Sequence, residues 1–281
     1  MKAPLRRKPL GSRLAHAVLP VYTALAVLYL FIPIVVMIAF SFNDPRGRQN
    51  ITWQGFTAQN YIDVWSRPDV TGPMLTSVIV AVVATLGATV LGTLIGLALT
   101  RYQFRGRGPT NLLIYVPMAT PEVILGASLL TLWVTAGVQR GLLTIIITHV
   151  MFNISYVVVT VRARIAGFDR ALEEAAMDLG ADGWTTFRKV TFPLILPGIV
   201  AAGLLAFVLS IDDYVITSFV SGQTRTFPLW VFGASRFGVP PEVNVLGTLI
   251  FVVAFATIAA QIVWARRRQG TELARSRRVA P

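Results

Sequence analysis

Apolar residues along this chain fall into six long runs separated by shorter polar segments. Each run has about 20 residues or more, the length that an α-helix needs to cross the hydrocarbon core of a bilayer. The pattern predicts an all-α polytopic membrane protein with six transmembrane helices. Prolines or acidic residues interrupt the third and fifth runs, so their ends are the least sharply defined. The runs cover residues 18–40, 73–100, 111–134, 142–161, 194–215 and 243–264.

The composition supports a membrane domain at residues 18–264, with a basic tail before it (1–17) and another after it (265–281). Of the 281 residues, 54% are apolar and only 14% are charged, values that suit a bundle of apolar spans with short loops. Five basic residues precede the first run, as in a signal peptide, but the run is long enough to span and lacks a convincing cleavage site. It is therefore predicted to be a retained first helix.

Two kinds of site are excluded by the sequence. The chain has no cysteine, which rules out a disulfide framework and a thiolate metal site. The phosphate-binding pattern G-x-x-x-x-G-K-[ST] is also absent, so the chain does not bind ATP by that device. No cofactor is predicted on this chain.

The net charge of +12 is unevenly distributed among the polar segments. Nineteen of the 25 lysine and arginine residues lie in the two tails and in residues 100–110 and 162–193. The alternate segments, residues 41–72, 135–141 and 216–242, hold the other six. Because basic residues are enriched in cytoplasmic loops, both termini are predicted to be cytoplasmic. The tail arginines suit anionic lipid headgroups, and nucleic acid is not a predicted partner.

The polar segment at residues 162–193 leads into the fifth apolar run through the stretch "EEAAMDLGADGWTTFRKVTFPLILP" at residues 173–197. Its first part predicts a helix with Asp169 as N-cap and Gly180 as a left-handed C-cap. Asp182 can cap a second short helix, which Pro193 is expected to end. The first helix carries one narrow apolar stripe with i, i+3, i+4, i+7 spacing: Leu172, Ala175, Ala176 and Leu179.

Two interpretations fit this hairpin. Small residues in the stripe allow another backbone to approach closely, which favours docking into a groove on a partner protein. An amphipathic helix lying on the inner headgroups would need the same stripe. The pattern of apolar positions does not separate the two.

The spacing of particular residues in the hairpin resembles the EAA loop of permease subunits in binding-protein-dependent ABC importers, whose pattern is EAA-x3-G-x9-I-x-L-P. Val190 and Phe192 are conservative departures from it. In that family, which has the MetI-like fold, the loop between the fourth and fifth spans forms coupling helices that sit in a cleft of a cytoplasmic ATPase dimer. The ATPase holds the ATP and Mg. The resemblance implies a coupling role for Glu174, Ala175, Ala176, Gly180, Val190 and Pro193.

Three carboxylates fall within or at the edge of apolar runs: Glu122, Asp212 and Asp213. A charge at the bilayer centre costs about 2.5–3.5 kcal/mol on insertion scales, so such groups usually face a cavity or a partner. In a regular helix the two aspartates would point about 100° apart and could not both face one narrow cavity. A structural interpretation also stands: Glu122 follows Pro121 and can open a half-helix, and the aspartates can mark a helix end.

The segments "PEVILGASLL" from Pro121 and "LSIDDYVITSFVSG" from Leu209 resemble the spermidine/putrescine branch of these importers. The resemblance implies a polyamine pathway past Glu122, Asp212, Asp213 and Tyr214, whose ring offers a cation–π contact. It also implies an external substrate-binding protein and a second, related permease subunit, with a homodimer as the alternative. Opines, amino-acid derivatives and phosphonates are substrates elsewhere in the branch.

The acids also fit a secondary transporter driven by an ion gradient. The absence of detectable inverted halves and the EAA-like hairpin argue against that class. For His149 in the fourth run, an interhelical hydrogen bond is predicted rather than proton relay, and Gly92 and Gly96 predict close helix packing.

Overall fold

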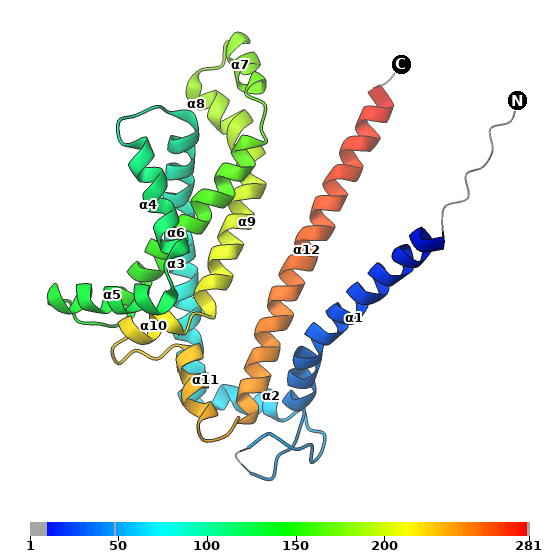
Figure 1. Ribbon diagram of the computed structural model, residues 1–281, viewed down its shortest axis with the longest axis vertical. Helices are drawn as coiled ribbons and strands as arrows, with labels where there is room; N and C mark the ends of the chain where they lie inside the picture. The colour runs from blue at the N-terminus through cyan, green and yellow to red at the C-terminus, as the bar shows by residue number, and fades with distance from the viewer. Residues whose placement is uncertain (1–9, 48, 280–281) are drawn as a thin grey trace, which may run out of the picture. The chain divides into compact units, whose positions relative to one another are not determined.

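The computed structural model describes residues 10–47 and 49–279, most of them helical (Figure 1). Over these ranges the one β pairing is an isolated bridge between Asn43 and Phe56. The chain divides into two compact units. One comprises Met1–Arg67 and Ala234–Pro281, and the other comprises Pro68–Gly233.

The first unit pairs the two ends of the chain. Helix α1 (Leu10–Ser41) packs along α12 (Pro241–Val279), and the two approach closely at Gly247, where an added Cβ would lie 2.8 Å from the Met37 sulfur. Asparagine amides hold the segment after α1, since Asn43 Nδ2 donates to Asn50 Oδ1 at 2.6 Å. The short helices α2 (Asn60–Asp63) and Val64–Ser66 complete this unit.

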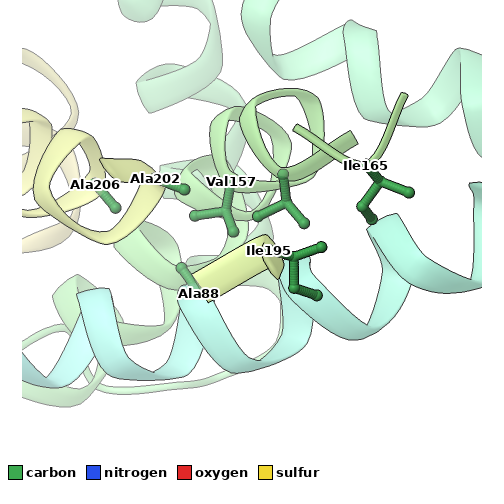
Figure 2. Packing of buried hydrophobic residues seen from close by; sticks show 7 residues of the cluster. Ala88, Val157, Ile165, Ile195, Ala202 and Ala206 are labelled. Atoms are coloured by element: carbon green, nitrogen blue, oxygen red, sulfur yellow. The ribbon is translucent and has the colours of Figure 1, made fainter. Parts of the chain in front are cut away.

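Three long helices form the body of the second unit: α3 (Pro68–Arg101), α6 (Leu142–Ala166) and α9 (Phe192–Ile211). Small residues permit their close packing. A Cβ on Gly92 of α3 would lie 2.6 Å from a Val157 methyl of α6, so the predicted packing role of this glycine is confirmed. Figure 2 shows the core that the three helices share, formed by Ala88, Val157, Val161, Ile165, Ile195, Ala202 and Ala206.

The third predicted span is not one straight helix. Helices α4 (Arg107–Ala119) and α5 (Glu122–Thr135) meet at an angle of 110°. The cause is Pro121, which disfavours the helical conformation of the residue before it. Thr120 accordingly has extended dihedral angles, with φ −82° and ψ 129°. The expected single span at 111–134 is therefore replaced by a bent helix pair.

The fifth predicted span, 194–215, ends earlier than expected. Helix α9 stops at Ile211, and α10 (Val215–Val220) and α11 (Phe227–Ser235) follow as separate short helices. The sixth predicted span, residues 243–264, lies inside α12.

Four helical segments in the described ranges are long and apolar enough to cross a membrane, or five if the bent pair counts as one span. The count of six transmembrane helices stays a prediction. The long segments are Val18–Ser41, Pro68–Arg101, Leu142–Ala166 and Gly183–Ile211.

Candidate functional sites

The polar hairpin lies between α6 and α9 and contains α7 (Ala171–Asp178) and α8 (Gly183–Thr186). The predicted left-handed turn at Gly180 is confirmed, with φ +87°. Asp182 caps α8 as expected by accepting the Thr185 N–H at 3.0 Å. Hydrogen bonds from Thr185 also hold the pKa of the Asp182 carboxyl below its ordinary value.

The expected end of the second helix at Pro193 is wrong. The chain continues from α8 through a π-helical turn, Phe187–Thr191, directly into α9. Pro193 lies in the first turn of α9, where a missing N–H breaks no bond and the fixed φ suits a helix. Val190, the remaining residue of the motif, is half-buried in the π-helical turn.

Helix α7 presents an apolar and acidic surface. Leu179, directly after the helix, is 90% exposed, and Leu172 and Met177 are about half exposed. Glu174 and Ala175 are also exposed, whereas Ala176 is half-buried. The one ion pair of Glu174 among the described residues is with Arg170, at 3.7 Å and on the open surface. An exposed pair of this kind contributes at most about 1 kcal/mol, so the Glu174 carboxylate remains available to a partner.

The neighbouring Glu173 has the opposite character. Its two oxygens accept from Arg101 Nη1 and Nη2 at 2.5 and 2.7 Å, and Oε1 also accepts from the Thr191 hydroxyl. Arg101 stacks over the Phe168 ring with its Cζ 5.6 Å from the ring centre. Sequence reasoning missed this cluster because 72 positions separate Arg101 from Glu173.

A second candidate site is an open pocket of about 550 Å³ within the second unit. Its walls come from the α4–α5 bend, from α6 and from the break between α9 and α10. All four acidic and aromatic residues predicted for the substrate pathway lie on these walls. The pocket is lined by Pro117, Met118, Ala119, Thr120, Pro121, Glu122, Leu125, Phe152, Tyr156, Leu209, Asp212, Asp213, Tyr214, Val215 and Ile216.

Asp212 and Asp213 both reach this pocket because α9 ends before them. The regular-helix geometry, which would have separated them by about 100°, does not apply. Asp213 is largely buried and accepts from the Thr217 N–H at 2.8 Å, the Thr217 hydroxyl at 2.6 Å and the Ile216 N–H at 3.3 Å. These bonds satisfy the free N–H groups at the start of α10.

Behind Asp213 lies the fully buried side chain of His149. Its Nδ1 is 2.6 Å from the Ser210 hydroxyl, and its Nε2 is 2.9 Å from the Thr217 hydroxyl and 3.4 Å from Asp213 Oδ2. The predicted interhelical hydrogen bond is confirmed, and it links α6 to both α9 and α10. Because the Thr217 proton is donated to Asp213, its oxygen accepts from His149 Nε2–H.

Asp212 is exposed in the pocket, and no hydrogen bond or ion pair joins its side chain to another residue within the described ranges. Glu122 is the exposed first residue of α5, where the helix dipole favours a negative charge. Glu122 therefore both opens a half-helix and lines the pocket. Tyr214 packs against Phe232 with ring centres 4.5 Å apart.

Two aromatic pocket residues were missed by sequence reasoning. Phe152 stacks edge-on against both His149 and Tyr156, with ring centres 5.7 and 6.1 Å apart. The three residues have i, i+3, i+7 spacing on α6, so they share one face of the helix. That spacing, read together with the acids, was the available signal. No group of three acidic or histidine side chains suited to a metal ion occurs in the part of the chain that the structure describes.

Comparisons with known proteins show the family of this chain. Residues 88–269 match the family described as binding-protein-dependent transport system inner membrane component. The chain is 38% identical over 239 residues to the spermidine/putrescine transport system permease protein PotC of Escherichia coli (strain K12), covering 85% of this chain and 90% of PotC. It is 36% identical over 263 residues to the putrescine transport system permease protein PotI of the same organism, covering 89% and 92%.

Solved structures show the same fold at low sequence identity. A structure of a bacterial ABC transporter that imports alginate aligns with a TM-score of 0.63 and 17% identity over 95% of this chain and 99% of that one. The inward-facing MetNI methionine ABC transporter aligns with a TM-score of 0.59 and 20% identity, covering 70% and 95%.

Proposed function

Because the chain belongs to the family of binding-protein-dependent transport system inner membrane components, we propose that it is one permease subunit of an ATP-driven importer for polyamines. Its multiple apolar helices and its relatives make it a multi-pass inner-membrane protein. The names of PotC and PotI support putrescine and spermidine as substrates. The observation that carries the proposal is the pocket that brings Glu122 and Asp212 together with three aromatic rings.

The chemistry of the pocket suits a flexible polycation. Carboxylates at separate points of the wall can each accept an ammonium group in a charge-assisted hydrogen bond. Tyr214, Phe152 and Tyr156 offer ring faces for cation–π contact and apolar surface for the methylene chain between the charges. Asp212 and Glu122 make the direct contacts in this proposal, because the Asp213 carboxylate is already used by Thr217 and Ile216.

The hairpin is proposed to dock into a cytoplasmic ATPase dimer, which binds the ATP and Mg. The distribution of basic residues supports cytoplasmic termini and a cytoplasmic hairpin. Exposed Leu179, Leu172 and Met177 give α7 an apolar surface for a cleft, and Glu174 adds an unburied charge. The EAA spacing supports this occupant over the lipid surface.

Transport then follows alternating access. A loaded binding protein docks on the external side, and ATP binding closes the ATPase dimer and moves the hairpins. The pocket opens to the delivered cation, and its affinity differs between the outward and inward states, which is what drives release. A second, related permease subunit completes the pathway in the proposed assembly.

The test is uptake of labelled putrescine and spermidine by cells that express the whole importer. Saturable uptake that needs an active ATPase and survives a protonophore supports the proposal. Uptake that a protonophore abolishes while ATP is maintained would favour an ion-coupled transporter. An assembled, ATP-hydrolysing importer that takes up neither compound would exclude polyamines, and opines, amino-acid derivatives and phosphonates would be assayed next.

A further inference from the structure

Helix α7 is only weakly held by its own packing. None of its residues is buried, and the segments on either side contain glycine, at Gly167 before the helix and at the left-handed Gly180 after it. Of its acidic side chains, only Glu173 has hydrogen bonds to the three-helix body. A displacement of α7 would therefore be absorbed by the flanking turns unless Glu173 resisted it.

The partner of Glu173 is the end of the longest helix in the second unit. Arg101 is the last residue of α3, which packs along α6 and α9 over much of its length. The guanidinium and the carboxylate form a two-bond fork, and their side chains are only 17% and 14% exposed. Such bidentate pairs fix direction as well as distance, which a single bond between flexible side chains does not.

Two further contacts make the cluster stiff. Thr191, in the π-helical turn that leads into α9, donates to the same carboxylate, and the Phe168 ring covers the guanidinium. The carboxylate of Glu173 thus connects α7, the end of α3 and the start of α9. Glu174, one position along, points away from this cluster and remains exposed.

We propose that Arg101 and Glu173 form the joint that passes movement of α7 to α3, so that the hairpin drives α3 and α9 together. The inference rests on the proposed docking of the hairpin into an ATPase. The pair acts by positioning: neither side chain lines the pocket. Without the joint, the ATPase would move α7 while α3 and α9 lag behind, and α9 contributes Leu209 to the pocket.

The test compares ATP hydrolysis with uptake in the complete importer reconstituted in proteoliposomes. The variants are Arg101→Gln, Glu173→Gln and the exchanged pair Arg101→Glu with Glu173→Arg. The matched control is Arg105→Gln, which removes an exposed charge from the same loop. Each single variant is expected to retain ATP hydrolysis. The number of substrate molecules imported per ATP should fall at least about fivefold, the smallest effect typical of coupling between two sites. The exchanged pair should recover most of the loss, and the control should match wild type.

A merely structural pair would behave differently. If hydrolysis and uptake fell in the same proportion in the single variants, the joint would be excluded. No recovery in the exchanged pair would exclude the pairing as its basis.

A second measurement does not depend on the substrate. Because the chain has no cysteine, spin labels can be placed at Leu94→Cys on α3 and at the exposed Asp178→Cys on α7 without competing sites in this subunit. With the joint intact, nucleotide binding should leave the α3–α7 distance unchanged, and with Glu173→Gln it should change. A wild-type distance that changes would overturn the inference. If the wild type imports neither polyamine but keeps this distance, polyamines would be excluded as substrates and the inference about the joint would stand.

Discussion

The hairpin and the pocket each contain two adjacent acidic residues, and in each pair the two carboxylates have different surroundings. In the hairpin, Glu173 is bound by Arg101 and Thr191 whereas Glu174 is exposed. In the pocket, Asp213 is bound by Thr217 and the start of α10 whereas Asp212 is exposed. The free acid comes second in one pair and first in the other.

The comparison teaches that neighbouring carboxylates in this protein divide two tasks. One carboxylate holds helices together, and the other is presented to something outside the chain. Burial decides which carboxylate has which task. A buried carboxylate needs partners within the protein, whereas an exposed one is free to bind a ligand. For the hairpin the proposed ligand is the ATPase, and for the pocket it is a cation.

The largest expected effect comes from removing the free acid of the hairpin. Truncating one partner of a charge pair that is buried and hydrogen-bonded at an interface costs about 2–5 kcal/mol, so Glu174→Ala should weaken ATPase binding about 30-fold or more if docking buries this carboxylate. The measurement is the dissociation constant between the purified ATPase and the permease pair in nanodiscs. Glu173→Gln serves as the comparison, since it should retain binding while lowering uptake per ATP. Equal loss of binding in both variants would contradict the assignment of Glu174 to the ATPase and of Glu173 to contacts within the chain.

The next effect separates the two aspartates of the pocket. Hydrogen bonds to charged groups contribute about 1.5–3 kcal/mol, so Asp212→Asn should raise the KM for putrescine about tenfold or more. Asp213→Asn should instead lower the amount of assembled protein while leaving the KM close to wild type. Kinetics of labelled uptake, normalised to protein in the membrane, separates the two. A higher KM in Asp213→Asn alone would reverse the assignment.

The sequence predicted the hairpin well because its features are local. A stripe at i, i+3, i+4, i+7, an N-capping Asp182 and a left-handed Gly180 all depend on neighbours within a few positions, and each is present. Pro193 was misjudged because a proline can either end a helix or occupy the first turn of the next one. Which occurs depends on whether the chain continues in the same direction.

The rest required contacts between distant segments. The Arg101–Glu173 fork joins residues far apart in sequence, and the arginine was interpreted only as a marker of topology. The carboxylates of the pocket were found from their cost in an apolar run, but their division of labour depends on α9 ending at Ile211. Hydrophobicity alone continued that helix to residue 215, because Tyr214 and Val215 are as apolar as a span requires.

A smaller effect tests the packing of α3 against α6, two of the helices in the body of the second unit. Helices α3 and α6 approach closely at Gly92, where an added Cβ would meet Val157 at 2.6 Å and the Ile154 carbonyl oxygen at 3.2 Å. Gly92→Ala should therefore destabilise the protein by about 1–3 kcal/mol through overpacking. Gly96→Ala is the matched control, since its nearest neighbour would lie at an ordinary 3.5 Å. Thermal unfolding in detergent should show a loss for the first variant only, and equal melting temperatures would refute the packing argument.

The smallest effect concerns a third acid of the hairpin, Asp182, whose task is to cap α8. Hydrogen bonds from Thr185 lower its pKa below the ordinary value of 3.8, so the cap is fully formed above that pH and is lost as the pH falls through the lowered pKa. Hydrogen exchange of the Thr185 amide should be faster in Asp182→Ala than in Asp178→Ala at neutral pH. The difference between the two variants should persist down to pH 3.8 and shrink only below it. If it vanished well above that value, Thr185 would not be stabilising the ionised carboxylate, and Asp182 would belong with the free acids.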